Sequence, residues 1–414
     1  MTGRRRTSRL VSIVGLALAF MFGSVMLVNL IPNERLAKHL GFSASRSDYE
    51  ASQFGFGNLD YWGECVGMSV GAGGHATRLT VVNRSLLSPA ARGCGGLPKY
   101  LEGELSESQL YWRYWHGYQI FARPLLFSTG LTRVHYLLLA ALVWAAAFFA
   151  YQALRVGVHC AAAFLVACFC VPLIEQASII THSMVWVLSF LAGALILGDA
   201  GRSRARRQEC LLLSGMLCCF FDLFTVPLVS LTVPLVALYW RGCHCREEHP
   251  LTAGEVCVLS GFWLGGFSIC WAAKWAAVSL FTDTPVFSDL VSVIRHRLVH
   301  PIGDDGRPLD VTAVRSVVLN ASVCWYGWAA IAGLAVVRAR TLITRIPHLW
   351  RNPGDLATPV LLLALPLLWL AIVQQHSIWH SWFVARIYFS TFALLATTIL
   401  APSSRRVARS SAIA

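Results

Sequence analysis

Two carboxylates early in the chain could supply a general base. Asp60 and Glu64 are four residues apart, so a helix would place both on one face. A transferase that acts on a hydroxyl group needs a carboxylate near its acceptor, and the low dielectric at a membrane rim can raise the pKa of that carboxylate toward the working pH. The alternative is that this stretch is only a solvated loop.

A second segment combines aromatic residues with cations that suit a phosphate. With helical spacing, the apolar stripe consists of Tyr111, Tyr114, Trp115, Tyr118, Phe121 and Leu125, and the opposite stripe of Arg113, His116, Gln119 and Arg123. We expect an amphipathic helix at about residues 106–128 that lies in the membrane interface, with its cations available to a phosphate. An aromatic belt that merely anchors the loop is the alternative.

An acidic residue interrupts apolar sequence at Asp222, within Phe221-Asp222-Leu-Phe-Thr225. A carboxylate embedded in a membrane is costly unless it is used or paired. We expect Asp222 to bind or orient a substrate, although capping of the following helix would also explain it.

A histidine pair follows near the C-terminus. His376 and His380 are one helical turn apart, the spacing of many metal pairs, and Arg386 comes shortly after them. Ser377 stands where a zinc protease would have its glutamate base, so this is not that motif. Hydrogen bonding to a phosphate or a sugar hydroxyl is the favoured role. The sequence indicates no certain cofactor, and a divalent metal at this pair is a minority alternative.

The elements that would position these residues are membrane spans. Of 414 residues, 56% are hydrophobic and 13% are charged, and the mean hydropathy is +0.58, which excludes an ordinary soluble enzyme. The net charge of +13 comes from basic clusters between apolar runs. That placement favours membrane lipids as partners, and no RNA-binding motif supports nucleic acid.

The apolar runs predict an all-α polytopic membrane protein with about ten transmembrane helices. They are residues 10–31, 133–152, 156–173, 183–198, 209–221, 223–240, 255–281, 314–337, 356–373 and 382–401. Alternating them places every arginine-rich short turn on one side, so both termini are expected in the cytoplasm. We expect four regions: a basic N-terminus and signal anchor at 1–31, a large outer loop at 32–132, a helix bundle at 133–401 and a basic tail at 402–414.

The cysteines fit the same topology. Only Cys65 and Cys94 fall in the large outer loop, where an oxidising compartment would allow a disulfide between them. The other cysteines lie in apolar runs or in turns expected in the cytoplasm, where they would be packing residues.

The organisation of the chain resembles the GT-C superfamily of integral membrane glycosyltransferases. The resemblance covers nearly the whole chain and lies in the signal anchor, the acidic first outer loop, the returning amphipathic helix and the polar outer loops. The segments that carry it are Leu59-Asp60-Tyr-Trp-Gly-Glu64, Arg113-Tyr-Trp-His116-Gly-Tyr118, Asp222-Leu-Phe-Thr225-Val-Pro227 and Gln375-His376-Ser-Ile-Trp-His380.

The resemblance implies inverting transfer of a sugar from a polyprenyl-phosphate-linked donor to an envelope glycan or lipid acceptor, on the outer face of a bacterial cytoplasmic membrane. It implies that an acidic residue of the first outer loop is the base. We expect Asp60 with assistance from Glu64, while the wider spacing of this pair than is common in the superfamily leaves Asp48 and Glu50 open. The remaining expected roles are donor-phosphate binding by Arg113, His116, Arg123 and Arg386, and substrate binding by Asp222, His376 and His380.

Two other functions fit a membrane protein with polar loops. A transporter or flippase for a lipid-linked sugar would favour charges at the midplane and related halves, and neither is visible in the sequence. A membrane O-acyltransferase that uses acyl-CoA would need a donor site on the cytoplasmic side, where mainly arginine-rich turns are expected.

Overall fold

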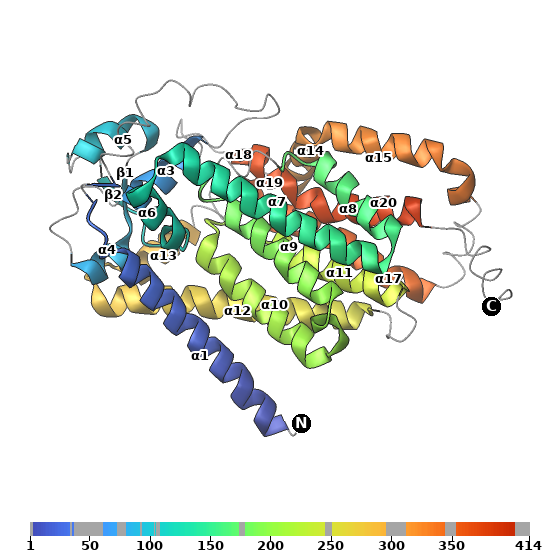
Figure 1. The fold of residues 1–414 in the computed structure, drawn as a ribbon, viewed down its shortest axis with the longest axis horizontal. Helices are drawn as coiled ribbons and strands as arrows, with labels where there is room; N and C mark the ends of the chain where they lie inside the picture. Colours follow the sequence, from blue (N-terminus) through green and yellow to red (C-terminus); the bar gives the residue numbers. More distant parts are fainter. Residues whose placement is uncertain are drawn as a thin grey trace.

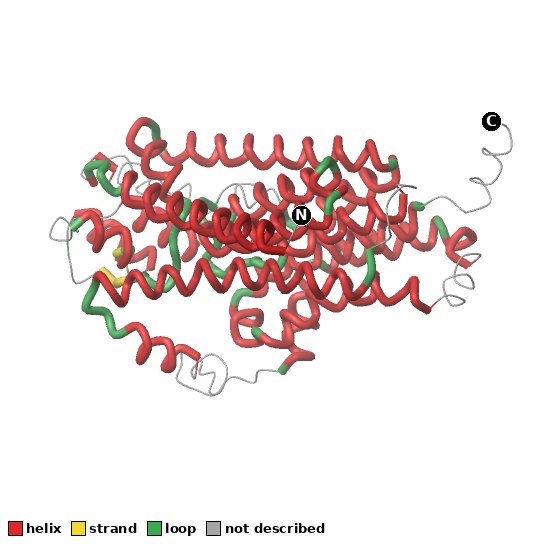
Figure 2. The backbone as a smooth tube through the Cα atoms, turned by 90° about the horizontal axis from the view of Figure 1, so that it is seen from below, coloured by secondary structure: helices red, strands yellow, loops and turns green. Residues whose placement is uncertain are grey.

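The computed structural model describes residues 3–33, 35–36, 61–72, 80–91, 93–102, 104, 108–173, 179–244, 251–294, 312–343 and 353–401. This part of the chain is almost entirely helical (Figure 2). Its one sheet pairs the short strands β1 (Pro89–Ala91) and β2 (Ser108–Leu110) in antiparallel fashion, with Ala90 opposite Gln109. The all-α prediction is therefore confirmed at the level of fold class.

The first half of the chain contains a long N-terminal helix, a group of short elements and a hairpin of apolar helices. They are α1 (Gly3–Val28), α3 (Tyr61–Ala72), α4 (Val81–Leu87), α5 (Gly93–Glu102), α6 (Gln119–Ser128), α7 (Leu131–Val156), α8 (Val158–Cys170) and α9 (Ser183–Leu197). The short elements α3–α6 and the two strands gather together at one end of the bundle (Figure 1).

The second half completes the bundle. Its α-helices are α10 (Arg204–Phe221), α11 (Val229–His244), α12 (Ala253–Phe281), α13 (Val286–Ile294), α14 (Ala313–Val323), α15 (Trp325–Val337), α17 (Pro353–Ile372), α18 (Gln374–Trp379), α19 (Ser381–Val384) and α20 (Phe389–Leu400). Two 3-10 helices, η5 (Ala200–Arg202) and η7 (Ala385–Tyr388), adjoin them.

Every predicted apolar run coincides with a helix or with consecutive helices, but fewer are long enough to span a membrane. Four stretches pass that test by length and composition: 5–28, 131–156, 253–281 and 381–400. The pair α14 and α15 makes a fifth if its 75° bend lies within one span, and α8, α9, α11 and most of α17 are shorter apolar helices. The chain is a helical membrane protein.

The helices divide into a core and a periphery. The apolar window of 381–400 is 83% buried, whereas those of α1, α7 and α12 are 17%, 28% and 28% buried. Lipid tails are as apolar as leucine, so peripheral helices keep apolar side chains on their outer faces. Leu16 of α1, Trp144 of α7 and Leu264 of α12 are exposed in this way.

Helices α10 and α12 touch backbone to backbone at two glycines. A Cβ on Gly215 would lie 2.0 Å from the carbonyl oxygen of Trp263, and one on Gly266 would lie 2.1 Å from that of Leu212. Small residues at crossings let membrane helices approach closely and gain dispersion contacts. Any side chain at either position would force the two helices apart.

Bonds between segments distinguish two ends of the bundle. At the arginine end, which comprises residues 5–9, 199–209, 241–244 and 251–255, Arg9 pairs with Glu209 and Arg207 with Glu255, both at 2.8 Å. The loop end comprises the described parts of residues 28–36, 61–128, 179–183, 222–228, 282–294 and 374–383. The expected site residues that the structure describes lie at the loop end, except Arg386, which follows residue 383 by three positions in the sequence.

Candidate functional site

Asp222 ends α10 at the loop end and closes the turn that leads into α11. Its Oδ1 accepts hydrogen bonds from the backbone N–H of Thr225 at 3.1 Å and from Thr225 Oγ1. This is the local turn bonding that aspartate favours. Its Oδ2 is buried and accepts no hydrogen bond from the described residues. One carboxyl oxygen therefore fixes the turn, while the other is available to a ligand.

The turn after Asp222 holds a strained aromatic residue. Phe224 has φ 67°, a left-handed conformation that costs a bulky residue about 1–3 kcal/mol and that occurs preferentially at functional sites. In this conformation its ring centroid lies 5.0 Å from that of Trp369 and 5.6 Å from that of His376. The turn that Asp222 closes therefore packs against the segment that carries His376.

A second set of ring contacts is made by Phe383. The ring centroid of Phe383 lies 5.1 Å from His182, 5.8 Å from His376 and 4.9 Å from His380. His182 is also near enough to Asp222 to favour its ionised form. We call His182, Asp222, His376 and His380, together with Phe224 and Phe383, the histidine cluster. Its members come from three separate segments of the chain.

The histidine cluster is largely buried, and the segments that carry it contain several polar side chains. Burial raises the pKa of the Asp222 carboxyl to about 6, against the opposing effects of the bonds from Thr225 and of His182. On the same segments, Thr181 Oγ1, Ser183 Oγ, Ser377 Oγ and both amide atoms of Gln375 are buried without a hydrogen-bond partner among the described residues. Buried polar atoms in native proteins are nearly always bonded, so these atoms are candidates to bond a ligand or ordered water.

Glu64, which we expected to assist the base, is bonded to two other segments of the chain. Its Oε1 lies 2.8 Å from His135 Nε2 on α7, and its Oε2 accepts a 2.7 Å hydrogen bond from the backbone N–H of Ile180. Both carboxyl oxygens are thus engaged, and the side chain is buried. Glu64 positions the segment that carries His182.

The predicted helix over about 106–128 is present only from Gln119 onward, as α6. Residues 108–110 form β2, and His116 has φ 54°, which ends any helix before it. The physical reason is the close approach of Gly117 to α10: its N–H donates to Phe220 O at 2.8 Å, and a Cβ there would lie 2.4 Å from the Phe220 ring. Trp115 and Tyr118 are consequently buried in protein rather than at headgroup depth.

His116 is a structural residue in this arrangement. Its Nε2 lies 2.8 Å from Tyr111 O, so Nε2 carries the proton, and Nδ1 accepts from Tyr118 OH at 2.9 Å. Burial lowers the pKa of His116 to about 3. Both nitrogens of the neutral imidazole are thus engaged within the protein, and phosphate binding by His116 stays a prediction from the sequence.

Arg123 joins the ends of two helices instead of facing a donor. Its guanidinium donates to the carbonyl oxygens of Val28, Gly71 and Ile31 and to Asn33 Oδ1, at 2.7–2.9 Å. The side chain is fully buried. Carbonyls at helix ends lack helical partners, and Arg123 supplies donors to those that follow α1 and α3.

The other predicted residues occupy different surroundings. Arg113 is partly exposed and forms a bidentate pair with Asp289 at 3.1 Å. Arg386 is buried and its Nε donates to Pro172 O at 3.1 Å. Asp60, Asp48 and Glu50 lie outside the described residues.

Cys65 is disulfide-bonded, and its predicted partner Cys94 is among the residues whose side chains are not described. Within the described ranges, no group of three or more His, Cys, Asp or Glu residues could hold a metal ion. The minority metal expectation at His376 and His380 gains no support from their surroundings.

No protein-family model, no curated protein and no solved structure matches this chain. The resemblance to GT-C enzymes therefore stays a prediction from the sequence.

Two residues at the site received no role from the sequence, namely His182 and His135. His182 directly precedes the apolar run of α9, and a histidine at the border of a span is a signal that could have singled it out. His135 lies within the first turns of α7, and only its bond to Glu64 distinguishes it.

Proposed function

We propose that this chain is an integral membrane glycosyltransferase of the GT-C type. It would move a sugar from a polyprenyl-phosphate-linked donor to an envelope glycan or lipid acceptor, on the outer face of a bacterial cytoplasmic membrane. The observation that carries the proposal is the histidine cluster, a largely buried group of hydrogen-bonding side chains in contact with aromatic rings at the loop end. Convergent polar groups in an aromatic setting suit a sugar, which needs both.

The proposed reaction is a displacement at the sugar's anomeric carbon. The acceptor oxygen forms the new bond as its proton passes to a carboxylate, and the bond from the anomeric carbon to the phosphate oxygen breaks with its electron pair. Polyprenyl phosphate leaves with inversion. Asp60, which directly precedes α3 in the sequence, remains the proposed base.

In this proposal the site residues divide the work. Asp222, His376 and His380 bind sugar hydroxyls, and His182 is added to them because it lies beside Asp222. Arg113, being partly exposed, is the proposed contact for the donor phosphate, with Arg386 further inside. Arg123, His116 and Glu64 hold the loop end in shape through the bonds described above.

The proposed orientation places the loop end outside and the arginine end in the cytoplasm, with ten spans in all. Cys65 at the loop end is disulfide-bonded, whereas Cys243 and Cys257 near the arginine end are exposed and form no disulfide with a described cysteine. Disulfides persist in oxidising compartments and free thiols in the cytosol. The arginines of the same end follow the positive-inside rule, which supports the same orientation.

The orientation can be tested with a membrane-impermeant maleimide. In intact cells, an Asp283→Cys variant should be labelled at position 283, since this exposed residue belongs to the loop end. Cys243 should be labelled only after permeabilisation, with peptide mass spectrometry identifying the modified thiol. Labelling of Cys243 in intact cells would reverse the proposed orientation.

Activity can be tested with purified protein, a panel of radiolabelled polyprenyl-phosphate sugars and envelope acceptors. We expect one donor to give a labelled acceptor together with stoichiometric free polyprenyl phosphate. A lipid-linked-sugar carrier is the second candidate, favoured by the 75° break between α14 and α15, because broken helices line the sites of many transporters. Movement of the intact donor across vesicles without release of polyprenyl phosphate would support the carrier and contradict the transferase.

A further inference from the structure

Helix α13 has two faces of different character. Val286, at its start, is buried with Leu86 and Leu87 of α4 and with Trp112 and Val278. Phe287 and Val291, one helical turn apart, are 74% and 64% exposed. Ser288, Asp289 and Ser292 lie on the remaining side by helical spacing. Neighbouring exposed apolar side chains, here Phe287 and Val291 on a helix that packs against the protein through Val286, are typical of a surface that contacts a partner.

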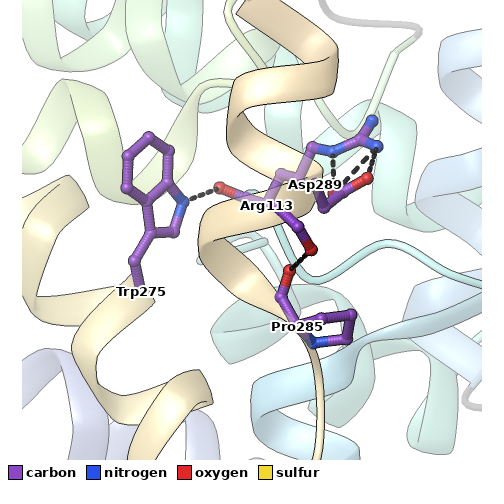
Figure 3. Close-up of polar contacts among 5 residues, drawn as sticks. Arg113, Trp275, Pro285 and Asp289 are labelled. Atoms are coloured by element: carbon purple, nitrogen blue, oxygen red, sulfur yellow. Dashed lines mark hydrogen bonds and ion pairs between the residues drawn. The ribbon is translucent and has the colours of Figure 1, made fainter.

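The polar side of α13 is bound to the segment that leads into α6. The Asp289 carboxylate accepts hydrogen bonds from Nε and from one Nη of Arg113, both at 3.1 Å (Figure 3). Trp275 of α12 donates a hydrogen bond to the Arg113 carbonyl oxygen at 3.4 Å. Trp271, one turn earlier, donates to the same carbonyl at 2.9 Å. These bonds fix the rotation of α13 about its own axis, so the direction of its apolar face is set.

The apolar face of α13 continues a surface that already faces lipid. The membrane-spanning helix α12 ends with the exposed residues Leu280 and Phe281. Only four residues separate Phe281 from the start of α13. The exposed side chains of α13 therefore continue the exposed apolar surface at the end of a membrane span.

We propose that α13 is an interfacial helix whose Phe287 and Val291 insert into the phospholipid layer around α12. Its partner is the bilayer surface itself, on the side of the loop end. The Arg113–Asp289 pair acts as the tether that keeps the apolar face turned toward the lipid. The sequence placed the interfacial helix at about 106–128, and this proposal moves that role to 286–294 without depending on the glycosyltransferase assignment.

The proposal can be tested by photo-crosslinking in the full-length protein. A benzophenone amino acid replaces Phe287 or Val291 on the apolar face, or Ser288 or Ser292 as matched exposed controls on the polar face. Each variant is reconstituted into phosphatidylcholine and phosphatidylglycerol vesicles that carry a radiolabelled phospholipid. Position Leu280 of α12 serves as the lipid-facing reference.

We expect positions 287 and 291 to take up labelled lipid at a level close to that of 280, and several-fold more than 288 and 292. An Asp289→Asn variant should reduce this difference between the faces, because the tether would lose its charge pairing. Equal labelling of all four α13 positions would overturn the proposal. So would a crosslinked dimer of the chain at 287 without lipid uptake, since that would identify a second copy as the partner.

Discussion

An Arg123→Ala variant should lose at least about 3 kcal/mol of stability, the largest loss we expect from a single side chain. The guanidinium donates to four acceptors, and its removal takes a hydrogen bond from Asn33 Oδ1 and from the carbonyl oxygens of Val28, Ile31 and Gly71. Of these, Val28 O keeps a bond from the Ile31 N–H at 3.2 Å. Each orphaned polar group costs about 1–3 kcal/mol. The measurement is the thermal midpoint of the detergent-solubilised protein, followed by the monodisperse fraction on size exclusion.

Two further variants complete this test. Arg133→Ala removes an exposed arginine from the first turn of α7 and should leave the midpoint nearly unchanged. Arg123→Lys should recover only part of the loss, because an ammonium group cannot reproduce the planar fork that reaches α1 and α3 together. If Arg123→Ala melted like Arg133→Ala while losing donor affinity, the phosphate-binding role predicted from the sequence would be restored.

The second large effect is expected from Asp222→Asn, which should lower kcat/KM for the lipid-linked donor by about 10-fold to 100-fold. A hydrogen bond to a charged group is worth about 1.5–3 kcal/mol, and the Oδ2 of Asp222 is the acceptor that we assign to a sugar hydroxyl. The change keeps the shape and the Oδ1 bond to Thr225, so the thermal midpoint should stay close to that of the wild type. An Asp199→Asn variant, which alters an exposed aspartate at the arginine end, is the control.

The same variant predicts a change in pH dependence. Burial raises the pKa of Asp222 to about 6, and the ionised form is the better acceptor. The wild-type kcat/KM should therefore rise with pH through about 6 and level off above it. Asp222→Asn should lack this acidic limb. Wild-type kcat/KM in Asp222→Asn would remove Asp222 from the substrate site.

Much of the fold follows directly from hydropathy. Among the described residues, the apolar runs located the four stretches that are long and apolar enough to span a membrane, because a bilayer demands continuous apolar sequence with its backbone bonds satisfied internally. The break at residue 324 was not visible, since the stretch 314–337 is mostly apolar and the bend arises at Cys324 between α14 and α15. Likewise, residues 111–125 have helical spacing, but contact of Gly117 with Phe220 restricts the helix to the part from Gln119 onward.

The candidate site was only partly predictable for the same reason. Asp222 and the His376–His380 pair stood out because charged and polar residues are rare within apolar sequence. Arg123 and His116 carried the same signal, yet their bonding partners are backbone carbonyls and a tyrosine hydroxyl, which no residue pattern reveals. His182 acquires significance only once the fold places it beside Asp222 and Phe383.

The glycine crossing of α10 and α12 also bears on the assembly of the protein during synthesis. Helix α10 begins with several arginines and is not among the helices apolar enough to span a membrane by themselves. Its closest contact, at Gly215 and Gly266, is with a helix that the ribosome makes later. Until α12 is made, the surface of α10 at Gly215 lacks the helix that packs against it in the finished fold. We therefore expect a bulky residue at either glycine to hinder the docking of α12 onto α10 during assembly.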